Sequence, residues 1–147
     1  MSAYRKILVA VDGSAPATKG LREAIRLAKS EGARLFIMNV VDEFYAFAPL
    51  DGLAPGVDLV PMLREGGEKV LARAKRVADA AKVKSTTVLR EMLSGPAADP
   101  IVREARKVGA DLIVLGTHGR RGVRRMVLGS DAEQVVRLAS VPVLLVR

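Results

Sequence analysis

Short apolar runs rich in β-branched residues recur along the chain, and such runs are typical of strands that are buried on both faces of a sheet. They occupy residues 7–11, 35–41 and 111–115. A fourth run, at residues 86–89, is shorter and more polar, which favours an edge position for that strand. Residues 143–146 are apolar at every position and form the last expected strand. The pattern therefore predicts a sheet of five strands.

Between these runs, apolar residues recur at the spacing of amphipathic helices. The first helix is expected to begin after Ser14, a typical N-cap residue with Pro16 close behind it, and to end at Gly32. The second is expected over residues 63–82, where the glycine pair at 66–67 costs about 1 kcal/mol per residue relative to alanine. The apolar face expected for this second helix consists of Val70, Ala74, Val77 and Ala81.

The starts of the two remaining helices carry recognisable capping residues. Asp99 is expected to cap the third helix, with Pro100 in its first turn and Gly109 at its end. Ser130 begins the pattern Ser-Asp-Ala-Glu, which is that of a capping box. The chain is thus expected to alternate strands and helices along its length.

This alternation implies right-handed β–α–β crossovers and a parallel sheet covered by helices on both faces, which is an α/β fold. In open sheets of this kind, ligands bind outside the carboxyl ends of the strands. Three of the expected strands end near Asp12, Val40 and Gly116. We therefore expect the ligand site to lie at the edge of the sheet where these positions meet.

A glycine-rich and arginine-rich segment, residues 116–130, joins the fourth strand to the last helix and reads GTHGRRGVRRMVLGS. Glycine allows a backbone to approach a ligand closely, and a helix N-terminus offers unpaired N–H groups and the positive end of its dipole. The junction therefore suits an anion such as phosphate. Gly116, Gly119 and Gly129 are the expected contacts, although turn residues that need positive φ would show the same glycines.

The charged residues of this segment divide into one expected ligand contact and several solvated side chains. Arg120 is the arginine expected to face phosphate, and the arginines at 121, 124 and 125 are expected to lie in solvent. His118 is the only histidine of the chain and has two interpretations, a general base or an exposed loop residue. The lack of an evident partner for its ring favours the exposed residue.

Composition limits the class of protein further. The 147 residues are most simply one domain, residues 1–147, and the absence of cysteine excludes disulfides. No apolar signal segment opens the sequence and no stretch reaches the ~18 apolar residues of a membrane span, so a cytoplasmic protein without a membrane partner is expected. The net charge of +8 raises the possibility of nucleic acid, but only 3% of residues are aromatic and the basic residues are spread over every helix. No nucleic-acid partner is therefore expected.

Residues 42–61 break the periodic pattern with three prolines and two glycines. A loop of this length usually has a function beyond connection. Phe44, Tyr45 and Phe47 cluster at its start. Two interpretations are open: these aromatic side chains pack the loop onto the body of the protein, or they form a lid beside the ligand.

Three separated motifs resemble those of the universal stress protein family, in its ATP-binding branch. They are the opening strand and turn at residues 6–14, the spacing Gly-x2-Gly-x9-Gly-Ser over residues 116–130, and the closing strand at residues 141–147. The resemblance covers nearly the whole chain and implies the strand order 3-2-1-4-5. It also implies ATP with magnesium as the ligand and a nucleotide-dependent role in regulating the stress response through an unknown protein partner. A homodimer is implied in which the apolar closing strand pairs antiparallel with its copy.

The resemblance also assigns roles to individual residues. The carboxylate of Asp12 is expected near the ribose and phosphates, and the backbone of Val40 is expected to recognise adenine. Gly129 and Ser130 are expected to hold the phosphates through backbone N–H groups and the hydroxyl. One departure is Asp131, which stands where nucleotide-binding relatives carry a small neutral residue and competes with phosphate for the helix dipole by roughly 0.3–1 kcal/mol. Asp131 is expected to weaken ATP binding without abolishing it, and to favour a bound divalent cation.

Two other functions stay open at this point. A member of this family can act through protein contacts alone, without a nucleotide. Adenylate-forming or ATP-pyrophosphatase chemistry occurs on a related fold, but residues 11–14 lack the fuller serine-rich and glycine-rich phosphate loop that this chemistry needs. No paired carboxylates, catalytic triad or metal cluster is evident in the sequence, so any ATP hydrolysis is expected to be slow and incidental.

Overall fold

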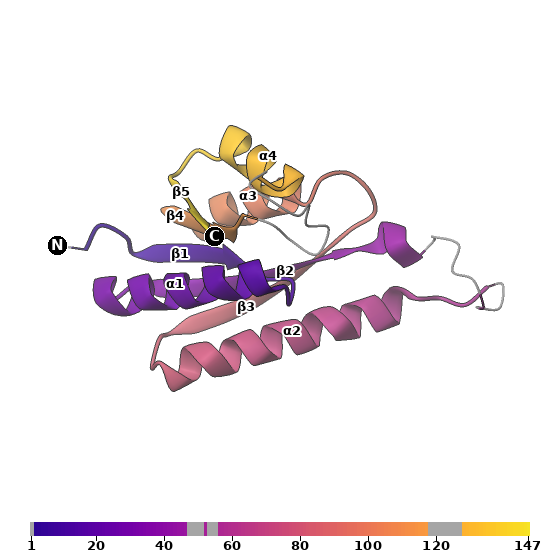
Figure 1. Ribbon diagram of the computed structural model, residues 1–147, viewed down its shortest axis with the longest axis horizontal. Helices are drawn as coiled ribbons and strands as arrows, with labels where there is room; N and C mark the ends of the chain where they lie inside the picture. The colour runs from indigo at the N-terminus through magenta and orange to yellow at the C-terminus, as the bar shows by residue number, and fades with distance from the viewer. Residues whose placement is uncertain (1, 47–51, 53–55, 118–127) are drawn as a thin grey trace.

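Five parallel strands form the sheet in the order β3-β2-β1-β4-β5, which confirms the expected α/β architecture and strand order (Figure 1). The computed structural model describes residues 2–46, 52, 56–117 and 128–147. All four neighbouring pairs of strands are parallel, so every strand has its carboxyl end at the same edge. The strands are β1 (Lys6–Ala10), β2 (Arg34–Asp42), β3 (Ser85–Met92), β4 (Leu112–Gly116) and β5 (Val143–Val146).

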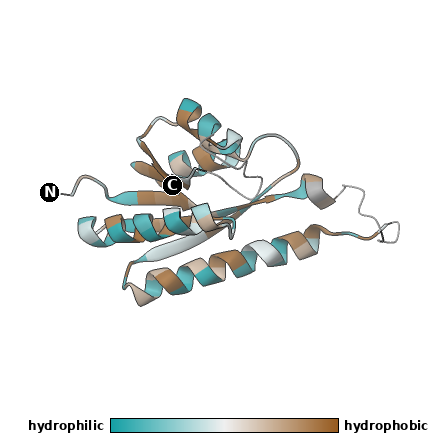
Figure 2. Ribbon diagram, viewed as in Figure 1, coloured by the Kyte–Doolittle hydropathy of each residue, from teal (hydrophilic) through white to brown (hydrophobic). Residues whose placement is uncertain are grey.

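Helices cover both faces of the sheet (Figure 1). Helices α1 (Ala15–Glu31) and α2 (Val60–Ala80) pack on one face, and α3 (Ala98–Val108) and α4 (Ser130–Leu138) pack on the other. A short 3-10 helix, η1 (Glu43–Ala46), follows β2. In Figure 2, hydrophobic residues concentrate on the inner strands, and hydrophobic and hydrophilic residues alternate along the helices. None of the helices in the described part of the chain is long and apolar enough to span a membrane.

Alternate side chains of the inner strands supply the two cores. In β1, Ile7 and Val9 belong to the core under α1 and α2, whereas Leu8 belongs to the core under α3 and α4. All three side chains are fully buried. Burial on both faces explains why the inner strands read as continuous apolar runs. β3 lies at an edge, as its more polar sequence predicts, and extends over eight residues because it pairs with β2 along its full length.

Several predicted helix ends are confirmed. The hydroxyl of Ser14 accepts a hydrogen bond from the N–H of Ala17 at 3.3 Å and so caps α1. Gly32 follows α1 with a φ of 66°, and Gly109 follows α3 with a φ of 66°. Glycine adopts this left-handed conformation without the steric cost that a Cβ would add.

The predicted apolar face of α2 is confirmed at Ala74, which is buried, and Val70 and Ala81 pack partly buried against the core, but Val77 is wrong. The buried residues are Gly67, Leu71, Ala74 and Ala78, and Val77, which was expected inside, is 45% exposed. Gly67 faces the sheet, where a Cβ would lie only 2.6 Å from Oδ1 of Asn39, so the lack of a side chain at this position allows helix and sheet to approach this closely. This close approach places Gly67 on the buried face, and apolar periodicity alone misses it.

The predicted starts of the last two helices are also corrected. α3 begins at Ala98 with Ala97 as its N-cap, so Asp99 lies in the first turn instead of capping it. α4 begins at Ser130 with Gly129 as its N-cap, so Ser130 is the first helical residue and the expected capping box does not form. α3 thus starts one residue before Asp99, and α4 starts at Ser130 itself, so in both helices the N-cap lies before the polar residue that was expected to cap it.

Candidate functional site

The carboxyl edge of the sheet brings together five of the seven predicted site residues. Asp12 follows β1, Val40 lies near the end of β2, and Gly116 ends β4. Gly129 and Ser130 start α4, and the N–H of Gly129 donates to the carbonyl oxygen of Thr117 at 2.7 Å, directly after β4. Gly119 and Arg120 lie outside the described residues, as does His118. Their roles remain predictions.

Asp12 forms the turn that joins β1 to α1. Its Oδ1 accepts a hydrogen bond from the N–H of Ser14 at 2.8 Å, which is the geometry of an Asx turn. Ser14 in turn caps α1. Asp12 therefore has a structural role in this turn, and the residue is half-buried at the carboxyl edge of the sheet. The predicted contact with ribose or phosphate is a separate role of the same side chain.

The backbone of Val40 extends past the point where its neighbour β1 stops. The ladder between β1 and β2 ends at the pair Ala10–Met38, whereas β2 continues to Asp42. The Met38 carbonyl points toward β1, because it accepts from the N–H of Val11 at 2.8 Å. Backbone groups alternate sides along a strand, so those of Val40 point the same way as those of Met38. They face the space beyond the end of β1, next to the Asp12 turn.

Gly116 has a packing reason to be glycine. A Cβ built on it would lie 2.6 Å from the carbonyl carbon of Pro16 and 2.8 Å from the nitrogen of Ala17, in the first turn of α1. Neither proposed sequence explanation, a turn with positive φ or contact with phosphate, is needed for this residue. Gly129 also lacks positive φ, with φ at −58°. The close contact between α1 and β4 thus accounts for Gly116 without excluding a ligand nearby.

The N-terminus of α4 offers backbone donors and carries acidic side chains. The first N–H groups of a helix have no intrahelical acceptor, and the N-cap Gly129 has no side chain to accept from them. Ser130 is exposed, and its hydroxyl makes no hydrogen bond to another described residue. Asp131 and Glu133 lie in the first turn, where their carboxylates complement the helix dipole. The arrangement suits an anion, in competition with Asp131.

A cluster of charged side chains at the ends of β2 and β3 was missed by sequence reasoning. Arg64 of α2 donates from Nε to the Glu91 carboxylate, and this hydrogen bond lowers the pKa of Glu91. Loss of hydration raises the pKa of Glu43 in η1, and the neighbouring Glu91 carboxylate raises it further. The cluster depends on the pairing of Val41 with Glu91, which no sequence period reveals. No group of three His, Cys, Asp or Glu side chains in the described ranges is arranged to hold a metal ion.

A second missed feature lies beside Val40. Arg90 is paired with Val40 in the β2–β3 ladder, and it donates two hydrogen bonds to Glu104 of α3, at 2.9 and 3.3 Å. The Glu104 side chain is only 5% exposed. A buried carboxylate needs such a partner, because an uncompensated charge in the interior is strongly unfavourable. This ion pair connects α3 to the edge strand β3.

The aromatic residues after β2 are only partly described. Phe44 lies in η1 and is 61% exposed. The side chain of Tyr45 and all of Phe47 lie outside the described residues. The packing and lid interpretations therefore both remain predictions.

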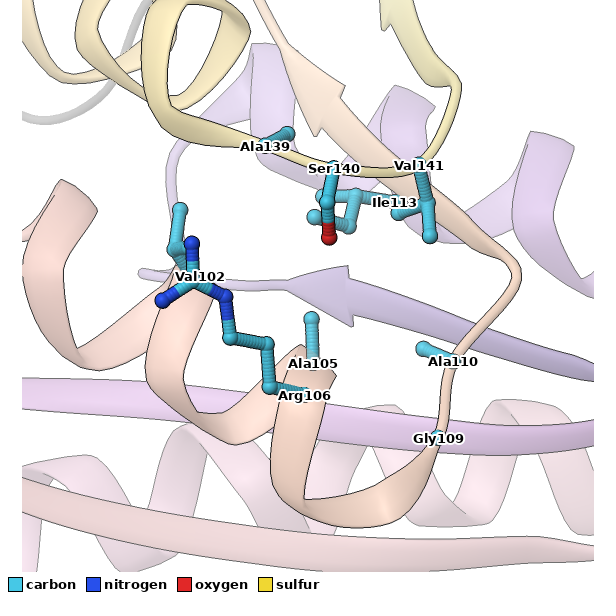
Figure 3. A pocket seen from close by; sticks show the side chains of 9 residues that line it. All are labelled: Val102, Ala105, Arg106, Gly109, Ala110, Ile113, Ala139, Ser140 and Val141. Carbon is cyan, nitrogen blue, oxygen red and sulfur yellow. The ribbon is translucent and has the colours of Figure 1, made fainter.

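A small cleft of about 60 Å³ lies at the opposite edge of the sheet, between the end of α3 and the segment that leads into β5 (Figure 3). Val102, Arg106 and Ile113 line it together with Ser140 and Val141. Ligand sites for small molecules usually have volumes of about 300–1,000 Å³. The cleft is too small for a nucleotide and lies away from the predicted site.

Comparisons with known proteins identify related chains and folds. A sequence model of the universal stress protein family matches residues 3–147. A universal stress protein from Methanocaldococcus jannaschii is 40% identical over 147 residues, which cover 98% of this chain and 82% of that protein. The crystal structure of a universal stress family protein from Burkholderia pseudomallei has a TM-score of 0.77 and 36% identity, with 99% and 98% of the two chains covered. A universal stress protein from Archaeoglobus fulgidus, solved in complex with dAMP, has a TM-score of 0.69 and 26% identity, with 98% of each chain covered.

Proposed function

The chain belongs to the universal stress protein family, and from that premise we propose that it binds an adenine nucleotide at the carboxyl edge of its sheet. The ligand we favour is ATP with magnesium. The bound nucleotide would regulate contacts with a protein partner during the stress response. A related structure that holds dAMP supports an adenine nucleotide as the class of ligand.

The orientation of the Val40 backbone is the observation that carries this proposal. Its N–H and C=O groups face the space beyond the end of β1, where none of the described strands pairs with them. Adenine offers a donor and an acceptor on one edge, so a backbone N–H and C=O on the same side of a strand are complementary to it. The half-buried carboxylate of Asp12 stands beside this space and is suited to accept from a ribose hydroxyl.

The phosphates would lie at the start of α4. Backbone N–H groups from Gly129 onward and the exposed Ser130 hydroxyl would donate to them, aided by the positive end of the helix dipole. Gly119 and Arg120 are the further contacts proposed from the sequence spacing. The carboxylate of Asp131 opposes the phosphate charge, so we expect affinity in the micromolar range, which corresponds to about −8 kcal/mol.

Magnesium would be held mainly by the phosphate oxygens. Mg²⁺ commonly keeps several waters and binds through one or two carboxylates together with substrate phosphates. The described residues hold no group of three ligands for a metal ion. Asp12, which follows β1, and Asp131, in the first turn of α4, are the carboxylates next to the proposed phosphate site and are suited to such a secondary role. With no activated nucleophile or base in the described part of the site, ATP hydrolysis would be slow.

The same edge of the molecule also supports an alternative, in which the protein acts through protein contacts without a nucleotide. The acidic first turn of α4 favours this alternative, since Asp131 and Glu133 already complement the helix dipole. Whether the protein binds a nucleotide distinguishes these two functions. In both cases we propose a homodimer that forms through β5.

Mass analysis of nucleotide released from the denatured purified protein is the first test, followed by titration calorimetry with ATP and magnesium. Matched variants separate the phosphate role of the glycine segment from a turn role. Gly119→Ala should weaken ATP binding at least tenfold, or about 1.4 kcal/mol, whereas Gly122→Ala lies outside the family spacing and should do much less. No heat and no thermal shift at millimolar ATP would favour the nucleotide-independent alternative.

A further inference from the structure

Asn39 is one of two polar or charged side chains that are buried among the described residues, with an exposure of 6%. Its Nδ2 donates a hydrogen bond to the carbonyl oxygen of Val11 at 2.8 Å. The N–H of Val11 donates to the carbonyl oxygen of Met38, also at 2.8 Å. Two successive residues of β2 therefore hold Val11, the residue that follows β1.

Helix α2 is packed around the other end of the same carboxamide. A Cβ on Gly67 would lie 2.6 Å from Oδ1 of Asn39 and 2.8 Å from Cδ1 of Leu89. The absence of a side chain at Gly67 therefore leaves the space that the carboxamide occupies. With Oδ1 against α2 and a carbonyl acceptor at Val11, the amide group keeps its donor on the β1 side.

The hydrogen bond from Asn39 leads directly to the proposed nucleotide site. Val11 is followed by Asp12, whose carboxylate accepts from the N–H of Ser14 at 2.8 Å. On the β2 side, the next residue after Asn39 is Val40, whose backbone faces the same space. One side chain thus links the two elements that would contact the ribose and the base.

We propose that Asn39 is a positioning residue of this site: it holds the Asp12 turn in place relative to the Val40 backbone, and it ties that spacing to the packing of α2 against the sheet. This inference rests on the proposed function, because the spacing acts on nucleotide affinity only if the nucleotide binds here. Asn39 itself touches no ligand in this arrangement. Its effect passes through Val11, and it links a change in the position of α2 to nucleotide affinity.

The first test replaces Asn39 by leucine, which has a similar shape and lacks the donor. Asn39→Leu should raise the Kd for ATP about tenfold and should speed hydrogen exchange at the Ser14 amide more than at the amide of Ile7 in β1. Ile101→Ala is the control, because it removes a buried side chain of α3 on the other face of the sheet. The control should lower stability while leaving the Kd and the ratio of the two exchange rates unchanged.

A second pair of variants acts from the helix side and leaves Asn39 in place. Gly67→Ala forces a Cβ against Oδ1 of Asn39, whereas a Cβ on Gly66 meets nothing within 4 Å. Gly67→Ala should weaken ATP binding severalfold and speed exchange at Ser14. Gly66→Ala should keep the parent affinity and raise the melting temperature, because alanine is a better helix former than glycine.

The outcomes separate this inference from the proposed function. If Asn39→Leu binds ATP as tightly as Ile101→Ala, or if exchange at Ser14 rises only as much as at Ile7, Asn39 is not a positioning residue. If the parent protein binds no ATP, the proposed function fails. In that case, if Asn39→Leu speeds hydrogen exchange more at Ser14 than at Ile7, the result would still support the role of Asn39 in positioning the turn. An equal increase at both amides would overturn that role.

Discussion

Gly20 of α1 and Gly116 at the end of β4 meet in a close backbone contact: a Cβ on Gly20 would lie 3.2 Å from the backbone nitrogen of Gly116. In the opposite direction, a Cβ on Gly116 would lie 2.6 Å from the carbonyl carbon of Pro16. The first turns of α1 therefore approach β4 more closely than two alanines would allow. This contact sets the position of α1, and with it the Asp12 turn, relative to the segment that leads to α4.

Gly116→Ala is expected to destabilise the protein by about 1–3 kcal/mol, the usual cost of inserting a methyl group into a well-packed interior. The obstacle is the peptide group between Pro16 and Ala17, a backbone contact that side-chain rotation cannot relieve. Gly20→Ala should cost less, because its contact is longer and alanine gains about 1 kcal/mol of helix propensity over glycine. Urea denaturation of both variants, with Gly66→Ala as a control in open helix surface, gives the comparison. A Gly116→Ala variant as stable as the parent would show that this contact is looser than described.

The Arg90–Glu104 ion pair leads to a second prediction. Arg90→Met should destabilise the fold by about 1–3 kcal/mol, because it removes the two hydrogen bonds that the half-exposed Arg90 donates to the buried carboxylate of Glu104. The double variant Arg90→Met with Glu104→Met should recover most of this loss, since a buried ion pair replaced by apolar side chains of similar volume is often neutral. A double-mutant cycle measured by denaturation tests the coupling. Additive effects of the two substitutions would mean that the pair contributes no interaction energy.

Much of the fold follows from local pattern. The apolar runs predict the strands within one or two residues at most ends, and their alternation with helices predicts the parallel sheet. Turn chemistry also predicts the ends of α1 and α3 at Gly32 and Gly109. These features depend on neighbours in sequence, and that is why a sequence alone suffices for them. The order of the strands instead came from the family resemblance.

The missed features depend on contacts between residues distant in sequence. The need for glycine at position 67 follows from its packing on Asn39, and the need for glycine at position 116 follows from its contact with Pro16. The periodicity of apolar residues in the sequence does not indicate either contact. The Arg90–Glu104 pair joins an edge strand to a helix across a loop, so each residue alone reads as an ordinary surface charge. The site was predicted as an edge of the sheet, and its supporting contacts required the three-dimensional structure.

Substitutions of the two neighbouring carboxylates Glu43 and Glu91 are expected to change the melting temperature in opposite directions, and both changes should depend on pH. Glu43→Gln should raise the melting temperature at neutral pH, because the raised pKa of Glu43 means that its ionised form opposes folding as the pH rises through that pKa. Glu91→Gln should lower the melting temperature at neutral pH, because the lowered pKa of Glu91 reflects a stabilising bond with Arg64. As the pH falls, the Glu43→Gln difference should shrink between the raised pKa of Glu43 and about pH 4.3, the ordinary pKa of glutamate. The Glu91→Gln difference should shrink only below about pH 4.3, as the pH falls toward the lowered pKa of Glu91. Melting curves of the three proteins across this range provide the measurement, and differences that persist at low pH would contradict it.

Asp131→Val should tighten ATP binding by no more than severalfold. The substitution removes the carboxylate that occupies the positive end of the α4 dipole, an interaction of roughly 0.3–1 kcal/mol. The Kd for ATP of this variant, measured by calorimetric titration, should be compared with the Kd of Asp79→Val. That control removes one carboxylate near the end of α2, at the other edge of the sheet. Equal gains in both variants would point to net charge, and the local competition at α4 would then be ruled out.

The proposed dimer depends on the free edge of β5. Within the described sheet, β5 pairs only with β4. The carbonyl groups of Pro142 and Val146 point toward β4, where they accept from Ile113 and Thr117 at 3.0 and 2.9 Å. Since backbone groups alternate sides along a strand, the N–H of Leu145 points away from β4, toward the edge that a second copy would pair with.

Leu145→Pro is therefore expected to give a folded monomer. Proline removes an N–H from the outer edge and none from the β4 ladder, and edge strands tolerate it in that orientation. Leu144→Pro is the matched control: its N–H points toward β4, so the substitution should disrupt the sheet itself and lower stability. Light scattering gives the mass of each protein at tens of micromolar, and circular dichroism reports whether it is folded. A Leu145→Pro variant that stays dimeric, or a parent that is already monomeric at this concentration, would exclude β5 pairing as the basis of assembly.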